Sequence, residues 1–128
     1  DVYKTQILEL VKWRNENLPV NTKFRKLKPI PPNIITKDPS AELKFNQKDT
    51  DSLPSYEILD KILEHLIDKN YNIKKIKKLG FNEVMIKKIW KMIKSSEFKR
   101  YQSAIGPKVS SMSFDKDRRF PITNKFSI

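Results

Sequence analysis

Residues 72–96, NIKKIKKLGFNEVMIKKIWKMIKSS, have the pattern of two helices joined by a tight turn. Asn72 can cap a short first helix, and Gly80 can end it because glycine tolerates a left-handed backbone. Asn82 can cap a longer second helix. Apolar residues recur at helical spacing and are expected to form the core: Ile73, Ile76, Leu79, Ile86, Ile89, Trp90 and Ile93. This stretch therefore predicts a mainly helical chain.

The remaining segments divide into a helix, a long loop and a tail. Residues 2–15 predict an amphipathic helix. Residues 18–54 predict a long loop, because five prolines between positions 19 and 39 interrupt any longer element. Residues 55–97 form the helical subregion, which opens with a second amphipathic helix, and residues 98–128 predict an extended tail. The expected fold class is mainly α with long loops.

Composition excludes several kinds of chemistry. The 128 residues contain no Cys and one His, which excludes a thiol nucleophile and Cys-ligated zinc and argues against a His-based metal site. His65 is expected to be a packing or surface residue. Apolar runs are far too short to cross a bilayer, so no membrane partner is expected.

Positive charge is concentrated in the second half of the chain. The net charge is +12, with 11 basic and 10 acidic residues before position 65 and 16 and 5 from there on. Eight lysines between positions 74 and 94 make a free-standing basic helix-turn-helix DNA-binding module one alternative. Readers of base sequence usually use Arg, Asn or Gln, so a solvated lysine surface is the other interpretation.

Three places offer chemistry beyond packing. Lys4 lies in the first turn of a predicted helix, where phosphates are favoured, although an ordinary exposed lysine would give the same pattern. Ser40 lies in the long loop beside Glu42, a composition typical of a mobile lid. Phe98, Lys99 and Arg100 combine an aromatic ring with two cations that could meet a flat anionic ring.

Six short motifs follow one another along the chain. Three of them are the most specific, namely Ser-Ala-Glu-Leu at 40–43, Asp-Ser-Leu-Pro at 51–54 and Asp-Arg-Arg-Phe-Pro-Ile-Thr-Asn at 117–124. The six motifs in this order resemble the C-terminal part of glutamine-dependent NAD synthetases. The resemblance implies the last helical segment of a Rossmann-like α/β synthetase domain of the adenine nucleotide α-hydrolase type. The family's Ser-Gly-Gly-x-Asp-Ser pyrophosphate loop and its glutaminase domain are not in these 128 residues.

The resemblance also implies an activity and its partners. Enzymes of this family use ATP and Mg²⁺ to adenylylate deamido-NAD, and ammonia from a glutaminase domain then displaces AMP to give NAD. They are expected to be cytoplasmic homo-oligomers, dimers or larger, with no nucleic-acid partner. Such a segment alone is expected to be inactive.

The family's residue roles map onto four positions. By resemblance, Lys4 contacts the ATP phosphates and Ser40 lies in the loop that closes over ATP, within the 18–54 region. Lys99 binds deamido-NAD. Phe98 takes the place next to it, where ammonia-dependent members have His. The resemblance implies no catalytic residue and no metal ligand within this chain.

Overall fold

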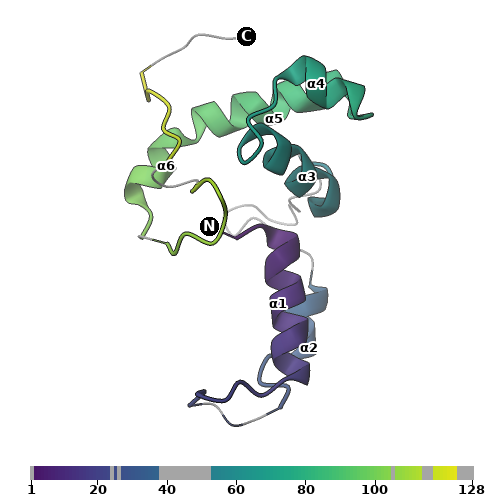
Figure 1. Ribbon diagram of the computed structural model, residues 1–128, viewed down its shortest axis with the longest axis vertical. Helices are drawn as coiled ribbons and strands as arrows, with labels where there is room; N and C mark the ends of the chain where they lie inside the picture. Colours follow the sequence, from purple (N-terminus) through teal and green to yellow (C-terminus); the bar gives the residue numbers. More distant parts are fainter. Residues whose placement is uncertain are drawn as a thin grey trace. The chain divides into compact units, whose positions relative to one another are not determined.

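The computed structural model is helical (Figure 1), and it describes residues 2–23, 25, 27–37, 53–104, 106–113 and 117–123. Within these residues there are helices and no strands. The helices are α1 (Lys4–Glu16), α2 (Pro32–Thr36), α3 (Tyr56–Leu66), α4 (Ile73–Lys78), α5 (Glu83–Ser95) and α6 (Glu97–Gln102). The chain divides into an N-terminal unit, residues 2–60, and a C-terminal unit from residue 61 onward, with the boundary inside α3.

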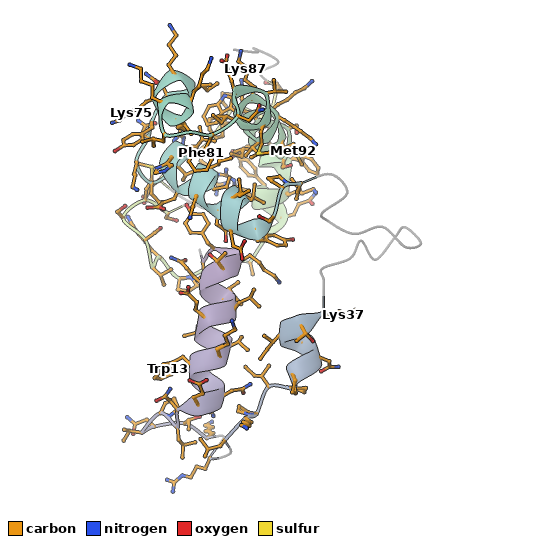
Figure 2. All side chains as sticks on the ribbon, turned by 90° about the vertical axis from the view of Figure 1, so that its right-hand side faces the viewer. Trp13, Lys37, Lys75, Phe81, Lys87 and Met92 are labelled. Atoms are coloured by element: carbon orange, nitrogen blue, oxygen red, sulfur yellow. The ribbon has the colours of Figure 1, made fainter. Side chains whose placement is uncertain are left out.

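In the N-terminal unit, α1 carries apolar side chains that nothing in that unit buries. The backbone N–H of Tyr3 donates to the Gln6 side chain at 3.0 Å where the helix begins. Leu10 is 59% exposed and Trp13 projects from the helix (Figure 2). The helix therefore forms as predicted, but its apolar side chains are spread around it and do not make the single apolar face that the sequence predicts.

The region predicted as one long loop contains a short helix. Helix α2 begins at Pro32, a residue that suits the first helical turn because its fixed φ is already helical. The side chain of Asn15 pairs with the backbone of Ile30, accepting from its N–H at 3.0 Å and donating to its carbonyl at 2.9 Å. This pairing holds the segment before α2 against the end of α1.

The C-terminal unit has the core that the helical pattern predicts. Its buried apolar side chains come from α3, α4 and α5 and from the residue after α3: Ile62, Leu66, Ile67, Ile76, Ile86, Ile89 and Ile93. Leu79 is an exception to the prediction, because it is 52% exposed. It follows the last residue of α4 at the C-cap, where the chain already leaves the helix. The helical spacing in the sequence therefore places Leu79 on the buried face of α4, although the helix ends at Lys78.

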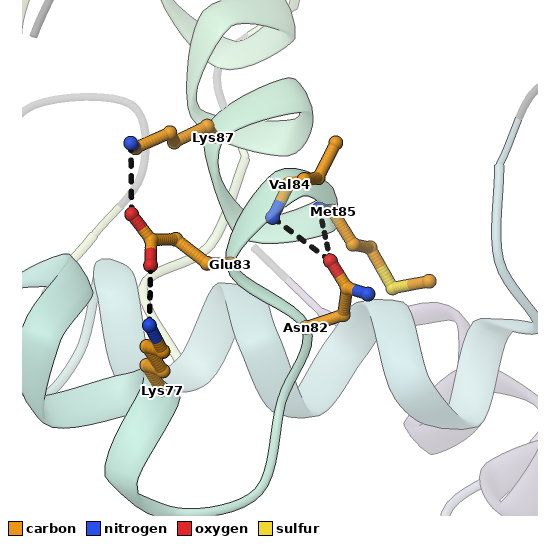
Figure 3. A network of polar contacts seen from close by, with 6 residues as sticks. All are labelled: Lys77, Asn82, Glu83, Val84, Met85 and Lys87. Carbon is orange, nitrogen blue, oxygen red and sulfur yellow. Dashed lines mark hydrogen bonds and ion pairs between the residues drawn. The ribbon is translucent and has the colours of Figure 1, made fainter.

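The turn between α4 and α5 forms as its sequence predicts. The Asn72 side chain accepts from the N–H of Lys75 at 2.8 Å, and Gly80 has φ +96°. The Asn82 side chain accepts from the N–H of Val84 at 2.8 Å and from that of Met85 (Figure 3). Local capping chemistry thus fixes both helix starts.

Glu83 joins the two helices through charge. Its carboxylate lies 2.7 Å from Lys77 of α4 and 2.8 Å from Lys87 of α5 (Figure 3). Hydrogen bonds from these two ammonium groups lower the pKa of Glu83 from 4.5 to about 2. Lys77 and Lys87 are therefore already paired with a carboxylate of the chain itself.

The C-terminal segment departs from the prediction at its start. Residues 98–102 belong to α6, so the extended tail begins after Gln102 rather than at Phe98. Ser96 lies between α5 and α6 and closes α5, since its N–H donates to the carbonyls of Met92 and Ile93. In the part of the chain that the structure describes, no helix has the length and apolar character needed to cross a membrane.

Candidate functional site

Lys4 is the first residue of α1, half-buried at the positive end of the helix dipole. A carboxylate is already bound at this end, because the N–H of Thr5 donates to Asp60 Oδ2 at 2.8 Å. Asp60 is 8% exposed. A phosphate near this helix end would therefore meet the Lys4 ammonium rather than the Thr5 amide.

Ser40, the second residue expected at the ATP, lies outside the described residues, as do its neighbours in the 38–52 loop. Its role stays a prediction from the resemblance. Thr36 and Lys37, just before this stretch, are described and exposed.

Phe98 and Lys99 project outward from α6. Phe98 is 45% exposed and Lys99 is exposed, while the residue before them, Glu97, is only 1% exposed. Successive residues on an α-helix point about 100° apart, so burying Glu97 turns the next two side chains away from the core. The aromatic ring and the cation are therefore available to a ligand.

Two arginines lie near the buried carboxylate of Glu97. Arg100 Nε is 3.5 Å from Glu97 Oε2, and Arg119 Nη1 is 3.9 Å from Oε1. Arg100 lies one helical turn further along α6, and Arg119 comes from the tail. The guanidinium of Arg119 also lies 4.7 Å from the centre of the Tyr101 ring, which adds a cation–π contact. The tail is thus paired with α6 by charge.

Arg118 joins the tail to the helical core. Its Nη1 donates to the carbonyl of Leu66 at the end of α3, at 2.5 Å. Its guanidinium lies 5.2 Å from the centre of the Trp90 ring and 5.4 Å from that of Phe120. Burial lowers the pKa of the Arg118 guanidinium from its ordinary value. Arg100 Nη1 donates to the Arg118 carbonyl at 2.7 Å, so α3, α5, α6 and the tail meet at this residue.

These contacts show what sequence reasoning missed. Local sequence pattern assigns no role to Glu97 or to the arginines of the 117–124 motif, which carries only a family resemblance. A usable signal was present, because Glu97 and Arg100 are three residues apart, the spacing at which opposite charges meet on a helix. Arg119, 22 positions after Glu97, could not be paired with it by local pattern.

No described group of residues is suited to a metal ion. Among the described residues, no three His, Cys, Asp or Glu side chains come together as a metal site would require. His65 is half-buried and stacks on Tyr71, with ring centres 5.6 Å apart, and burial lowers its pKa. We assign no Mg²⁺ ligand to the residues that the structure describes.

Comparison with known proteins decides the family. The sequence pattern of the family described as NAD synthase matches residues 1–103. The chain belongs to the NAD synthase family. Its relatives include glutamine-dependent NAD(+) synthetases of Acinetobacter baylyi, 44% identical over 97% of this chain, and of Aquifex aeolicus, 44% identical over 98%. The chain spans only about a fifth of the length of these relatives, 22% and 21%.

A solved NAD synthetase structure agrees with this family assignment. The glutamine-dependent NAD+ synthetase of Acinetobacter baumannii, in complex with ADP, is 33% identical and superposes with a TM-score of 0.55. The match covers 97% of this chain and 20% of that one. The helical segment thus corresponds to one part of a larger synthetase. None of these matches supports the DNA-binding alternative.

Proposed function

We propose that this chain is a segment of a glutamine-dependent NAD synthetase that amidates deamido-NAD to NAD at the expense of ATP. The observation that carries the proposal is the match to the Acinetobacter baylyi synthetase, 44% identical over 97% of the chain. The proposal includes the Rossmann-like α/β domain to which this helical segment would belong. A cytoplasmic location and assembly into a homo-oligomer come from the resemblance alone.

The proposed reaction has two steps that balance without a redox partner. The nicotinate carboxylate of deamido-NAD attacks the α-phosphorus of ATP, and pyrophosphate leaves. Ammonia, supplied by glutamine hydrolysis in a separate domain, then attacks the acyl carbon, and AMP leaves. Both steps need phosphate charge to be neutralised and the two reactants to be held in line. Lysines placed at the reactants meet the first of these requirements.

Lys4 and Ser40 are proposed to bind ATP. The position of Lys4 supports its part, because it lies at the start of α1, where the helix dipole adds to its own charge. Asp60 already accepts from the neighbouring amide of Thr5, so Lys4 would hold phosphate through its ammonium group. Ser40 is proposed on the resemblance.

Lys99 and Phe98 are proposed to bind deamido-NAD. Both are exposed side by side on α6, which supports their availability to a ligand. A lysine can pair with an anionic group of the dinucleotide, and a phenyl ring can pack against one of its flat bases. Phe98 replaces the His of ammonia-dependent members, so its contact would be apolar rather than a hydrogen bond.

Assay of the complete protein that contains these residues tests the proposal. With deamido-NAD, ATP–Mg²⁺ and either glutamine or ammonia, we expect NAD, AMP and pyrophosphate in equal amounts. Release of ADP and phosphate in place of AMP and pyrophosphate would contradict the adenylylation chemistry. Absence of NAD with both nitrogen donors would contradict the function itself.

A further inference from the structure

We propose that Glu97 is a positioning residue of the dinucleotide site, acting through its pairing with Arg119 of the tail to set the direction of Phe98 and Lys99. The inference rests on the proposed function, since it concerns how the proposed deamido-NAD residues are held. It adds a role for two residues to which the resemblance gave none.

Burying the carboxylate of Glu97 is energetically unfavourable, so the groups around it must compensate its charge. The residue is 1% exposed, and among the described residues neither of its oxygens accepts a hydrogen bond. Taking an ion out of water costs several kcal/mol unless opposite charge compensates it. The guanidinium groups of Arg100, at 3.5 Å, and Arg119, at 3.9 Å, provide that charge. The two arginines therefore make the buried orientation of Glu97 possible.

The orientation of Glu97 fixes that of its neighbours. Helix α6 has only six residues, too few for a helix to hold its place without tertiary contacts. A rotation of α6 by about 100°, the step between neighbouring residues, would bring Phe98 inward and Glu97 out. The Glu97–Arg119 pair opposes that rotation, because Arg119 belongs to a different segment of the chain.

Contacts of the neighbouring residues hold this part of the tail in place, so Arg119 is kept beside Glu97. The next residue back, Arg118, donates to the Leu66 carbonyl and lies against the Trp90 ring at 5.2 Å. The next residue on, Phe120, meets Trp90 edge to face at 5.3 Å. Residues 118–120 thus bind α3 and α5 on either side of the residue that pairs with Glu97.

The experiment compares Glu97→Gln, Arg119→Gln and the double variant in the complete protein. Each single variant should raise the KM for deamido-NAD about tenfold, equivalent to about 1.4 kcal/mol, and leave the KM for ATP unchanged. The double variant should be no worse than either single one, because both remove the same pairing. Arg119 is at the edge of the cluster, 35% exposed, so its variant should fold even where a buried glutamine does not.

Glu83→Gln is the matched control. Glu83 also has two cationic partners, but its carboxylate lies on the surface at the start of α5, the end of that helix away from α6. It should leave both KM values unchanged. An equal rise in the KM for ATP and for deamido-NAD in Glu97→Gln and Arg119→Gln would show a general loss of structure and overturn the positioning role, as would unchanged kinetics in Arg119→Gln.

Hydrogen exchange separates this inference from the proposed function. Backbone amides of α6 should exchange faster in Arg119→Gln and Glu97→Gln than in the parent protein, whatever reaction the protein catalyses, because α6 is the element that the pairing holds in place. Unchanged exchange there overturns the pairing. A parent protein that forms no NAD overturns the proposed function, and with it the substrate part of the inference, while exchange still decides the pairing.

Discussion

Arg118→Met should release the tail from the helical core. The substitution keeps an apolar stem of similar length and removes the guanidinium, which donates to the Leu66 carbonyl and lies 5.2 Å from the Trp90 ring and 5.4 Å from the Phe120 ring. A hydrogen bond from a charged group contributes about 1.5–3 kcal/mol. The cation–π contact with Trp90 adds about 0.5–1 kcal/mol, whereas Phe120 belongs to the tail and its contact with Arg118 does not hold the tail to the core.

Two effects reduce the total stabilisation expected from these contacts of Arg118. Burial of the guanidinium has a cost, seen in the lowered pKa of this residue, and that cost disappears with the charge. The methionine stem also keeps part of the contact with Trp90. We therefore expect a net loss of about 2 kcal/mol in the local stability of the tail, which is roughly a 30-fold rise in the fraction of open tail.

Hydrogen exchange of the complete protein, read by mass spectrometry on peptides covering 117–123, measures this release. The exchange rate should rise roughly 30-fold in Arg118→Met. Arg25→Met is the matched control, because Arg25 is exposed in the N-terminal unit and should leave this region unchanged. Exchange within twofold of the parent protein in Arg118→Met would refute the reasoning.

Three further predictions concern stability. Asn82→Ala should lower the free energy of unfolding by about 1 kcal/mol in urea titration, because the α5 cap is lost, whereas Asn82→Ser should keep most of it; equal loss in both would contradict the cap. The pKa of Glu83 is lower in the folded protein, about 2, than the usual 4.5, so its pairing stabilises the fold above pH 4.5 and is lost as the pH falls toward 2. The melting temperature of the parent protein should therefore fall more over that range than that of Glu83→Gln; parallel curves would contradict the assignment. Residues 1–128 expressed alone should melt without a sharp transition, because α1 buries no side chain and leaves Ile7, Leu10 and Trp13 exposed to water; a cooperative melt at high temperature would contradict this.

The features that could be predicted from sequence are those decided by local chemistry. Asn72 and Asn82 cap their helices because an amide oxygen reaches the first free N–H groups within three residues. Gly80 takes a positive φ because it has no Cβ to oppose it. The six ordered motifs likewise led to the correct family, since short motifs in a fixed order are specific even when each alone is weak.

What could not be predicted depends on contacts between distant segments. The partner of Thr5 at the start of α1 is Asp60, 55 residues away, and it changes how an anion could bind there. The charged sequence around Glu97 is typical of an exposed helix surface, yet the side chain is buried and lies between Arg100 and Arg119. Leu79 fits the helical period but falls where α4 has ended. The contacts of Thr5 and Glu97 join distant segments, which periodicity along one helix does not describe, whereas the error at Leu79 comes from the position of the helix end.

The central claim is that this chain provides separate lysines for the two substrates of an NAD synthetase. The most direct test is the pair of KM values, for ATP and for deamido-NAD, in Lys4→Ala and Lys99→Ala of the complete protein, with exposed Lys12→Ala on α1 and Lys91→Ala on α5 as controls. Losing a charge-assisted contact of about 1.5–3 kcal/mol should raise only the KM for ATP in Lys4→Ala and only that for deamido-NAD in Lys99→Ala, each roughly 10- to 100-fold. Equal changes in both constants, or changes no larger than those of the controls, would contradict the claim.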